Sequence, residues 1–227
     1  LDLGDFIHGD QSLRNQFVKE LGHAFRHIGF VGIVNHGIPR DMVKAFYAQA
    51  KQFFSLPVEV KRKYEVPGLA GQRGYTSFGK EHAKPSSVAD VKEFYQIGQE
   101  VDDSDPIKSE YPDNVMTQDC PEFTKIGNQL YRSFERSGAY LLQAIALDLG
   151  LDVDSFKDKI HHGNSILRAI HSPPIIQEPD SAIRSEQHED INLITLLVGA
   201  SAGGLQVLNL KGEWLDVVPE ADEIVVN

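Results

Sequence analysis

The sequence predicts an α+β fold in which a helix-rich first half precedes a β-rich second half. Up to Gly150 the apolar residues recur every three or four positions, which is typical of the buried face of a helix. After Gly150 they occur in short runs separated by Gly, Pro, Asn and Asp, which is typical of strands. With 227 residues, 41% of them hydrophobic, the chain can bury a core as one large domain or two packed lobes. We expect an α-rich region at 1–115 and a second region, with a scaffold helix and the β core, at 116–227.

The chain opens with a predicted helix, strand and turn. Four apolar residues recur at every fourth position of the helix: Leu13, Phe17, Leu21 and Phe25. Asp10 or Ser12 supplies its N-terminal cap. The apolar run at 30–34 predicts a strand. Asn35-His36-Gly37 then predicts a turn with a structural role.

The rest of the first half predicts helices joined by two loops. A helix over 42–54 precedes a short charged helix ending near Tyr64. Residues 67–90 and 102–122 have loop composition, and long loops in compact domains often carry function. The apolar spacing over 123–149 predicts a scaffold helix roughly 40 Å long. Strands are then predicted at 165–170, 191–198, 205–210 and 223–226.

Composition restricts the class of function. The formal net charge of −11 opposes a general nucleic-acid role, because phosphate contacts favour a basic surface, so a small-molecule substrate is the expected partner. The single cysteine, Cys120, cannot form an internal disulfide, which predicts a reducing cytoplasm. The absence of an apolar run of about 20 residues predicts that the chain does not cross a membrane. The sequence leaves the oligomeric state open.

His188-Glu189-Asp190 is a candidate metal motif. In an extended chain, side chains two residues apart project to the same side, so this imidazole and this carboxylate can bind one ion. Two histidines and one carboxylate suit oxygen-activating iron(II). The motif alone is weak, because His8-Gly9-Asp10 has the same spacing. Context favours the later pair, since Asp10 is a helix-cap candidate whereas Asp190 precedes the strand predicted at 191–198.

Sequence blocks along most of the chain resemble those of one enzyme family. The stretch of His188-Glu189-Asp190, Leu193-Ile194-Thr195-Leu196-Leu197 and Gly203-Gly204-Leu205-Gln206-Val207 resembles the isopenicillin N synthase-like iron(II) and 2-oxoglutarate-dependent dioxygenases. The other matching blocks occur along the chain in the same order as in that family. They are Gly29-Phe30-Val31, Val34-Asn35-His36-Gly37-Ile38-Pro39, Arg73-Gly74-Tyr75, Gly79-Lys80-Glu81, Lys92-Glu93-Phe94, Leu167-Arg168-Ala169-Ile170-His171-Ser172-Pro173-Pro174 and Gly212-Glu213-Trp214.

The resemblance implies a double-stranded β-helix, or jelly roll, backed by helices. It also implies that His188 and Asp190 bind iron(II) with a second histidine from a later strand, and that 2-oxoglutarate and dioxygen are co-substrates. The implied reaction hydroxylates or desaturates a small molecule and releases succinate and carbon dioxide. Further polar residues are candidates for contacting the co-substrate or the substrate. Those for the co-substrate are Ser172, Arg168, Asn192 and Gln206, and those for the substrate are Arg73 and Tyr75.

The chain departs from the family pattern in two ways. His188 is its last histidine and no Arg-x-Ser follows, so we expect an incomplete set of C-terminal strands and a continuation beyond Asn227. Ser172 stands where many members have a tyrosine, which leaves open an iron oxidase that uses no 2-oxo acid. A catalytically silent jelly-roll binding protein is the third interpretation. His171 is not expected to replace the missing ligand, because side chains alternate along a strand and it would point away from the face of Ile170.

Three other features have structural interpretations. His23 and His27, one helical turn apart, are expected to be a surface pair. His161-His162 is expected in a polar turn. Gly203-Gly204 predicts a tight turn between strands, because no helix start follows it to bind phosphate.

Overall fold

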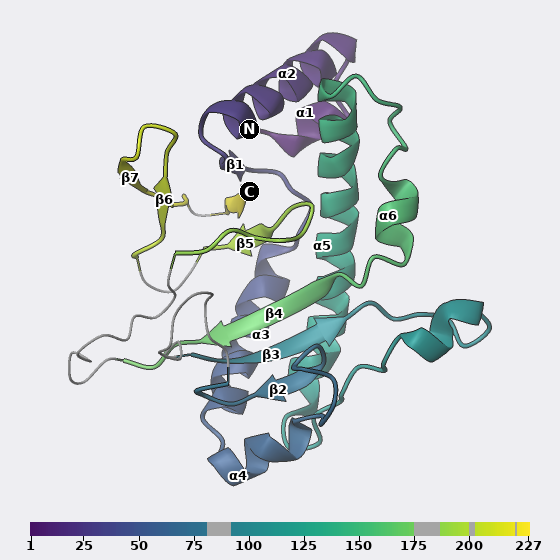
Figure 1. The fold of residues 1–227 in the computed structure, drawn as a ribbon, viewed down its shortest axis with the longest axis vertical. Helices are drawn as coiled ribbons and strands as arrows, with labels where there is room; N and C mark the ends of the chain where they lie inside the picture. Colours follow the sequence, from purple (N-terminus) through teal and green to yellow (C-terminus); the bar gives the residue numbers. More distant parts are fainter. Residues whose placement is uncertain (81–91, 175–186, 200–202, 221) are drawn as a thin grey trace. The chain divides into compact units, whose positions relative to one another are not determined.

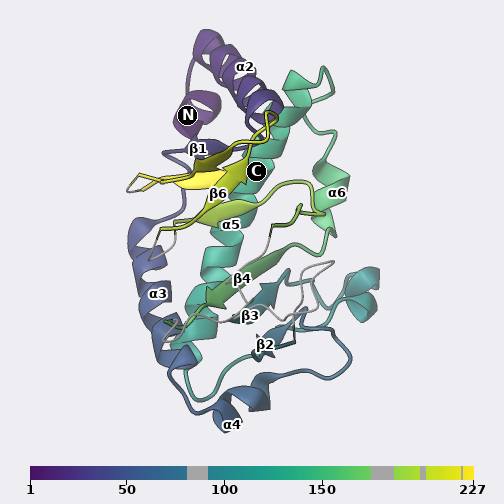
Figure 2. The same ribbon diagram turned by 60° about the vertical axis from the view of Figure 1, so that its left-hand side comes forward.

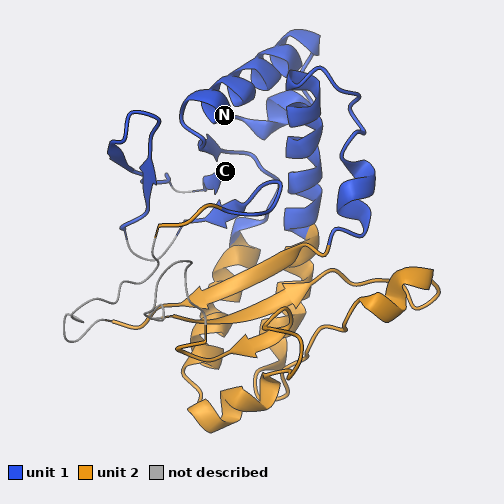
Figure 3. Cartoon of the chain, in the orientation of Figure 1, with its two compact units in different colours: residues 1–40, 133–163, 190–227 blue, residues 41–132, 164–189 orange. Residues whose placement is uncertain are grey.

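The computed structural model divides the chain into two compact units (Figure 1, Figure 3). Unit 1 comprises residues 1–40, 133–163 and 190–227, and unit 2 comprises residues 41–132 and 164–189. The structure describes residues 1–80, 92–174, 187–199, 203–220 and 222–227. Each unit is built from segments far apart in the sequence. The predicted division between residues 115 and 116 stays a prediction.

Unit 1 combines helices with antiparallel sheets. Its elements are α1 (Leu3–Ile7), α2 (Gln11–His27), β1 (Val31–Ile33), α6 (Lys157–His161), β5 (Leu196–Val198), β6 (Gln206–Leu208), β7 (Trp214–Asp216) and β8 (Ile224–Val226). β8 lies between β1 and β5, and β6 pairs with β7. Val226 stands opposite Val31 on one side and Leu196 on the other. The first and last strands of the structure therefore share one ladder.

Unit 2 is built on a three-stranded antiparallel sheet. Its elements are α4 (Val58–Lys61), the 3-10 helix η1 (Arg62–Tyr64), β2 (Gly74–Thr76), β3 (Glu93–Gly98), the 3-10 helix η2 (Pro106–Glu110) and β4 (Ile166–His171). β3 lies between β2 and β4, as Figures 1 and 2 show. Nearly all of α3 (Arg40–Phe54) also belongs to unit 2, and α5 (Pro121–Asp148) contributes to both units.

Aromatic side chains form the core of unit 2. Phe53, which is fully buried, packs at ring-centroid distances of 5.0 Å from Phe123, 5.1 Å from Tyr95 and 5.9 Å from Tyr75. Burial of such rings contributes a large part of a domain's hydrophobic stabilisation. The sheet is thereby fixed against α3 and α5 within this unit.

Local sequence explains where the first elements begin and end. The Asp10 carboxylate accepts hydrogen bonds from the backbone N–H groups of Ser12 and Leu13, so Asp10, and not Ser12, caps α2. The turn after β1 has two positive φ angles, 50° at Asn35 and 75° at Gly37, which these residue types tolerate best. The structural interpretation of this turn is confirmed.

The long helices were predicted correctly and several short elements were not. The apolar positions of 13–25, 42–54 and 123–149 fall in α2, α3 and α5, except Leu149, which follows the end of α5. The expectation of an unbroken loop over 67–90 is wrong, because β2 forms there by pairing with β3, while residues 81–90 lie outside the described ranges. No pattern in the sequence predicted α1, β3 or α6. None of the helices in the described ranges combines the length and hydropathy needed to cross a membrane.

The strand predicted at 191–198 is wrong in its first half. Only Leu196–Val198 forms β5. The side chain of Asn192 donates a hydrogen bond to the backbone carbonyl of Ile194, and such side chain-to-backbone bonds favour a turn over a strand. The turn places Asn192 and Thr195 near the start of β5 as a local polar cluster.

Candidate iron and co-substrate site

The carboxylate of Asp190 is held at one end of the β5–β8 ladder of unit 1. Asp190 Oδ2 accepts hydrogen bonds from Thr195 Oγ1 at 2.5 Å and from Asn227 Nδ2 at 3.0 Å. Thr195 and Asn227 also exchange two backbone hydrogen bonds, with N–O distances of 2.8 and 3.2 Å. The ladder that joins the two strands therefore also fixes both side chains that bind this carboxylate.

Asn192 extends this arrangement by one residue. Its side-chain amide donates to Thr195 Oγ1 at 3.0 Å, and Thr195 in turn donates to Asp190. A hydroxyl has one proton, so accepting from Asn192 directs that proton toward the carboxylate. In the structure Asn192 braces the candidate iron ligand.

His188 lies in unit 2, two residues before Asp190 in the sequence. Both residues are exposed and belong to the irregular segment 187–190. An imidazole nitrogen and a carboxylate oxygen form a donor set that suits iron(II). Metal-binding carboxylates are themselves hydrogen-bonded by neighbouring groups, as Asp190 is by Thr195 and Asn227. These donor types suit iron(II), and the binding of the ion by His188 and Asp190 stays a prediction.

The other co-substrate candidates lie on different strands. Gln206 in β6 is exposed and donates to Asp216 Oδ1 across the β6–β7 hairpin at 2.9 Å. Arg168 in β4 lies over the ring of Phe94 in the same unit, with its guanidinium carbon 4.3 Å from the ring centroid. Ser172 directly follows β4 and is half-buried. Their contact with a co-substrate stays a prediction.

Side chains alternate along β4 as expected. Arg168 and Ile170 are exposed, whereas Ala169 and His171 are half-buried on the other side of the strand. His171 Nδ1 lies 2.8 Å from Glu93 Oε1. The prediction that His171 points away from the face of Ile170 is confirmed.

The two substrate candidates, Arg73 and Tyr75, lie inside unit 2. Arg73 has 0% exposure and donates to the carbonyl of Gln72 at 2.8 Å and to Asn164 Oδ1 at 3.1 Å. Burial lowers the pKa of Arg73. Burial also raises the pKa of Tyr75, whose hydroxyl donates to Glu93, and this hydrogen bond raises that pKa further. These contacts give both residues a role in packing, and their contact with substrate stays a prediction.

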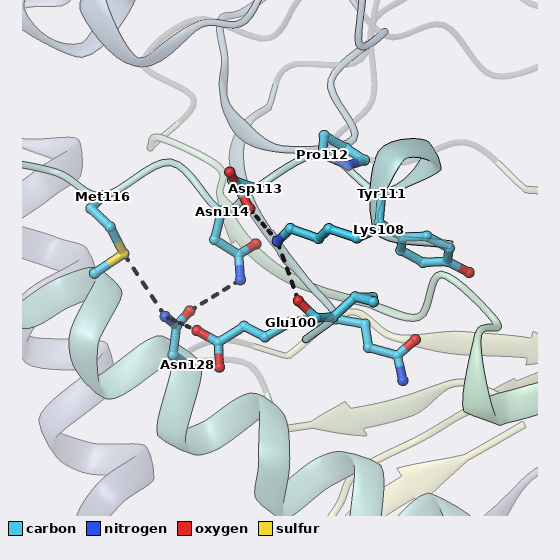
Figure 4. Close-up of a pocket in the computed structure, with 10 residues that line it drawn as sticks. Glu100, Lys108, Tyr111, Pro112, Asp113, Asn114, Met116 and Asn128 are labelled. Atoms are coloured by element: carbon cyan, nitrogen blue, oxygen red, sulfur yellow. Dashed lines mark hydrogen bonds and ion pairs between the residues drawn. The ribbon is translucent and has the colours of Figure 1, made fainter. Parts of the chain in front are cut away.

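A pocket of about 340 Å³ in unit 2 was not expected from the sequence (Figure 4). Its polar groups bind one another. Lys108 Nζ lies 2.6 Å from Asp113 Oδ1, and Asn128 donates to Glu100 at 3.1 Å. None of the predicted site residues lines this pocket. The signal that could have pointed to it was the loop composition of 102–122.

The remaining histidine motifs lie elsewhere. His23 and His27 are exposed and stack with ring centroids 4.0 Å apart, as expected of a surface pair. The polar turn expected at His161-His162 is confirmed for His162, which caps α6, and is wrong for His161, which is the last residue of that helix. His36 lies in the turn after β1, where burial lowers its pKa.

Comparisons with known proteins identify the family. Residues 1–119 match the model described as non-haem dioxygenase in morphine synthesis N-terminal, and residues 163–227 match the 2OG-Fe(II) oxygenase superfamily. A 2-oxoglutarate-Fe(II) type oxidoreductase of Metarhizium rileyi is 33% identical, and the alignment covers 100% of this chain and 68% of that protein. A proline hydroxylase of Petromyces alliaceus is 30% identical, with 100% and 73% covered.

Solved structures agree with these matches. A crystal structure of a 2OG-Fe(II) oxygenase family protein from Caulobacter crescentus is similar with a TM-score of 0.86 and 37% identity, covering 100% of this chain and 72% of that one. A full-length Neurospora crassa protein crystallised in complex with alpha-KG is similar with a TM-score of 0.85 and 29% identity, with 100% and 71% covered. The chain therefore belongs to the 2OG-Fe(II) oxygenase superfamily, whose enzymes use iron(II), 2-oxoglutarate and dioxygen.

Proposed function

We propose that this protein hydroxylates or desaturates a small-molecule substrate with dioxygen while 2-oxoglutarate is converted to succinate and carbon dioxide. One oxygen atom of dioxygen enters succinate, and the other enters the hydroxylated product or leaves as water on desaturation. The observation that carries the proposal is the Asp190 carboxylate, held by Thr195 and Asn227 two residues after His188. We further propose that the antiparallel sheets belong to a double-stranded β-helix backed by helices. Regions 1–115 and 116–227 would correspond to its α-rich N-terminal part and its catalytic core.

In this proposal His188 and Asp190 bind iron(II) through an imidazole nitrogen and a carboxylate oxygen. The bound iron supplies the activation of dioxygen, and oxidative decarboxylation of 2-oxoglutarate supplies two electrons. Thr195 and Asn192 keep the Asp190 carboxylate in one orientation, which lowers the entropy cost of binding the ion.

The candidates for contacting the co-substrate are the polar side chains of Ser172, Arg168, Asn192 and Gln206. Ser172 has a hydroxyl at the end of β4, and Arg168 is a cation on the exposed face of that strand, suited to a dicarboxylate. Gln206 is an amide donor that belongs to unit 1. Both N–H groups of the Asn192 amide already donate to Ile194 and Thr195, so Asn192 would act through Thr195. Arg73 and Tyr75 would act on the substrate only through the backbone around β2, because their side chains are buried.

Relatives indicate which molecules to test as substrates. One structure of the Neurospora crassa protein, 28% identical to this chain, contains alpha-KG and thymine, and one curated relative is a proline hydroxylase. We therefore propose a small polar organic substrate, and thymine and proline are the first compounds to test. The cytoplasmic location suggested by the lone Cys120 stays a prediction.

Ser172 favours one alternative, an iron oxidase that takes all its electrons from the substrate. The serine side chain is several ångströms shorter than tyrosine, so a water would have to bridge it to a 2-oxo acid. Succinate formation separates the two functions, because only the 2-oxoglutarate-dependent reaction produces it.

An anaerobic titration with iron(II) and 2-oxoglutarate tests the proposal. The wild-type protein is expected to develop a metal-to-ligand charge-transfer band and, after addition of air, to form succinate. His188→Ala and Asp190→Asn should lose both signals, whereas His23→Ala, which removes an exposed histidine of α2, should retain them. The proposed function would be contradicted if the wild-type protein showed no charge-transfer band and formed no succinate. Full succinate formation by Asp190→Asn would also contradict it.

A further inference from the structure

Three polar side chains of unit 2 surround one buried carboxylate, that of Glu93. Lys61 Nζ donates to Glu93 Oε1 at 2.9 Å and to Oε2 at 2.7 Å, and the Tyr75 hydroxyl donates to Oε2. His171 Nδ1 lies 2.8 Å from Oε1. Lys61, Tyr75, Glu93 and His171 are called here the Glu93 network. Its first three members are at most 3% exposed, whereas 39% of the His171 side chain is exposed.

The balance of donors and acceptors places a proton on Nδ1 of His171. A carboxylate accepts about four hydrogen bonds and donates none. Glu93 receives two from Lys61 and one from Tyr75, and the fourth comes from His171. Because a carboxylate cannot donate, His171 Nδ1 must carry a proton in this hydrogen bond. The third proton of Lys61 is bound by the carbonyl of Phe54 at 2.9 Å, so the ammonium group is also satisfied.

The Glu93 network holds one end of the sheet of unit 2. Glu93 is the first residue of β3, His171 is the last residue of β4, and the two stand directly opposite each other. The imidazole also stacks on the ring of Phe54, with centroids 5.2 Å apart and planes at 21°. His171 is therefore fixed through its edge by Glu93 and through its face by Phe54. Ser172 is the next residue in the chain.

Stability alone does not explain a buried ion pair at this position. The cost of removing two charges from water offsets much of their attraction, and apolar side chains of similar volume often stabilise a core at least as well. What the ion pair adds is a fixed side-chain orientation, because each hydrogen bond holds its partner in one place. In the Glu93 network, the partly exposed side chain that these hydrogen bonds orient is His171.

We propose that the Glu93 network is a positioning device for the co-substrate, which fixes His171 and through it sets the backbone of Ser172 so that the serine hydroxyl meets 2-oxoglutarate. The inference rests on the proposed function, because it takes Ser172 as a contact of 2-oxoglutarate. His171, Glu93 and Lys61 are positioning residues in this arrangement and touch no reacting atom.

Two substitutions separate the hydrogen bond of His171 from its packing. His171→Asn places an amide N–H close to the position of Nδ1 and keeps a donor to Glu93, whereas His171→Phe keeps an aromatic ring on Phe54 and removes the donor. The dissociation constant for 2-oxoglutarate is measured anaerobically with iron(II), and KM and kcat are taken from succinate formation. For His171→Phe we expect about a tenfold rise in the dissociation constant and in KM with little change in kcat, and for His171→Asn less than about a twofold rise.

The outcomes distinguish positioning from simple packing. Unchanged 2-oxoglutarate constants in His171→Phe overturn the inference, as do equal losses in His171→Phe and His171→Asn. Thermal unfolding checks that each variant is folded, and His171→Leu, which also lacks a donor, replaces His171→Phe if the latter is not.

A spectroscopic test needs no ligand. In ¹⁵N-labelled wild-type protein, neutral His171 should carry its proton on Nδ1, and a proton on Nε2 would overturn the assigned network. Failure of the proposed function has a different signature, because the wild-type protein would then neither bind 2-oxoglutarate nor form succinate.

Discussion

Thr195 is the residue through which the chain controls the orientation of Asp190. Replacing it with valine keeps the shape but removes the hydroxyl that donates to Asp190 Oδ2. Because neighbours of metal ligands typically contribute 10–100-fold to metal affinity, we expect Thr195→Val to weaken iron(II) binding about tenfold. Thr195→Ser keeps the hydroxyl and should bind iron(II) nearly as tightly as the wild type. Anaerobic equilibrium titration with iron(II) measures both, and equal affinities in the two variants would argue against this role.

Lys61 and Lys80 are a matched pair for measuring what burial does to an ion pair. Lys61 binds Glu93 at 2.7 Å with side-chain exposures of 4% and 1%, whereas Lys80 binds Glu65 at the same distance with exposures of 53% and 21%. Lys61→Met leaves a buried charge without its cation and should lower the free energy of unfolding by about 3–5 kcal/mol. Lys80→Met should cost less than about 1 kcal/mol. Urea unfolding measures the free energy of unfolding of both variants, and similar losses in the two would contradict the predicted effect of burial.

Single residues were predictable where their role is local. The cap of α2 and the turn after β1 depend on neighbours within a few positions, and the sequence contains that information. Arg73 and Tyr75 lie in a Gly-rich stretch that predicts exposure, yet both are buried. Their partners, Asn164 and Glu93, are distant in the chain, so composition could not reveal their environment.

At the level of elements, the first turn of α2 depends on one side chain. The Asp10 carboxylate accepts from the N–H groups of Ser12 and Leu13 at 2.9 and 3.0 Å. Asp10→Ala should therefore lower the free energy of unfolding by about 1 kcal/mol. Ser12→Ala is the control, with an expected change below about 0.5 kcal/mol, because Ser12 contributes only its backbone N–H to this cap. Equal losses of unfolding free energy in the two variants, measured by urea unfolding, would show that both side chains contribute to the cap.

The last residue of β3, Gly98, lies against a buried arginine side chain. A Cβ on Gly98 would overlap the guanidinium of Arg73, a side chain that is fully buried. Gly98→Ala should lower the free energy of unfolding by about 1–3 kcal/mol through overpacking. Gly203 provides the control, because a Cβ there would meet only open space, and Gly203→Ala should be nearly neutral. Urea unfolding compares the two variants, and a neutral Gly98→Ala would show that Arg73 can rearrange.

Elements were predictable in proportion to their length. The stripes of α2, α3 and α5 extend over several turns, so their periodicity is unambiguous. β2 has only three residues, and β3 buries the polar side chains of Glu93 and Gln96, so its sequence lacks the apolar run that predicts a buried strand. Pairing in a sheet can override local composition, which explains why both strands were missed.

At the level of the molecule, the sequence supported the α+β class and the family but not the way the units are assembled. Helices in the first half and short strands in the second were visible as periodicity. The ladder of β1 with β8 joins Val31 to Val226, and no local signal connects strands so far apart. Only the ordered sequence blocks, taken together, indicated the iron site. The geometry of the Glu93 network depends on side-chain contacts that a single sequence does not show.

The buried tyrosines predict how the stability of the protein depends on alkaline pH. Burial raises the pKa of both Tyr75 and Tyr95 above the ordinary value of 10.0, and the hydrogen bond to Glu93 raises that of Tyr75 further. In the folded protein these hydroxyls keep their protons at a pH where the unfolded chain has lost them. Their stabilising contribution is therefore fully present below about pH 10 and is lost as pH rises above it. Each tyrosine should lower the free energy of unfolding by up to about 1.4 kcal/mol per pH unit there.

Tyr95→Phe isolates one of these contributions. The variant lacks the hydroxyl that donates to the carbonyl of Val115 at 2.6 Å, so at neutral pH it should lose about 0.5–1.5 kcal/mol. Above about pH 10 its stability should fall less steeply than that of the wild type, because one titrating group is gone, and the two curves should converge. Urea unfolding from about pH 8 to about pH 11.5 measures both curves. Parallel curves over this range would mean that Tyr95 ionises equally easily in the folded and unfolded protein, which its burial among Phe53 and Phe123 argues against.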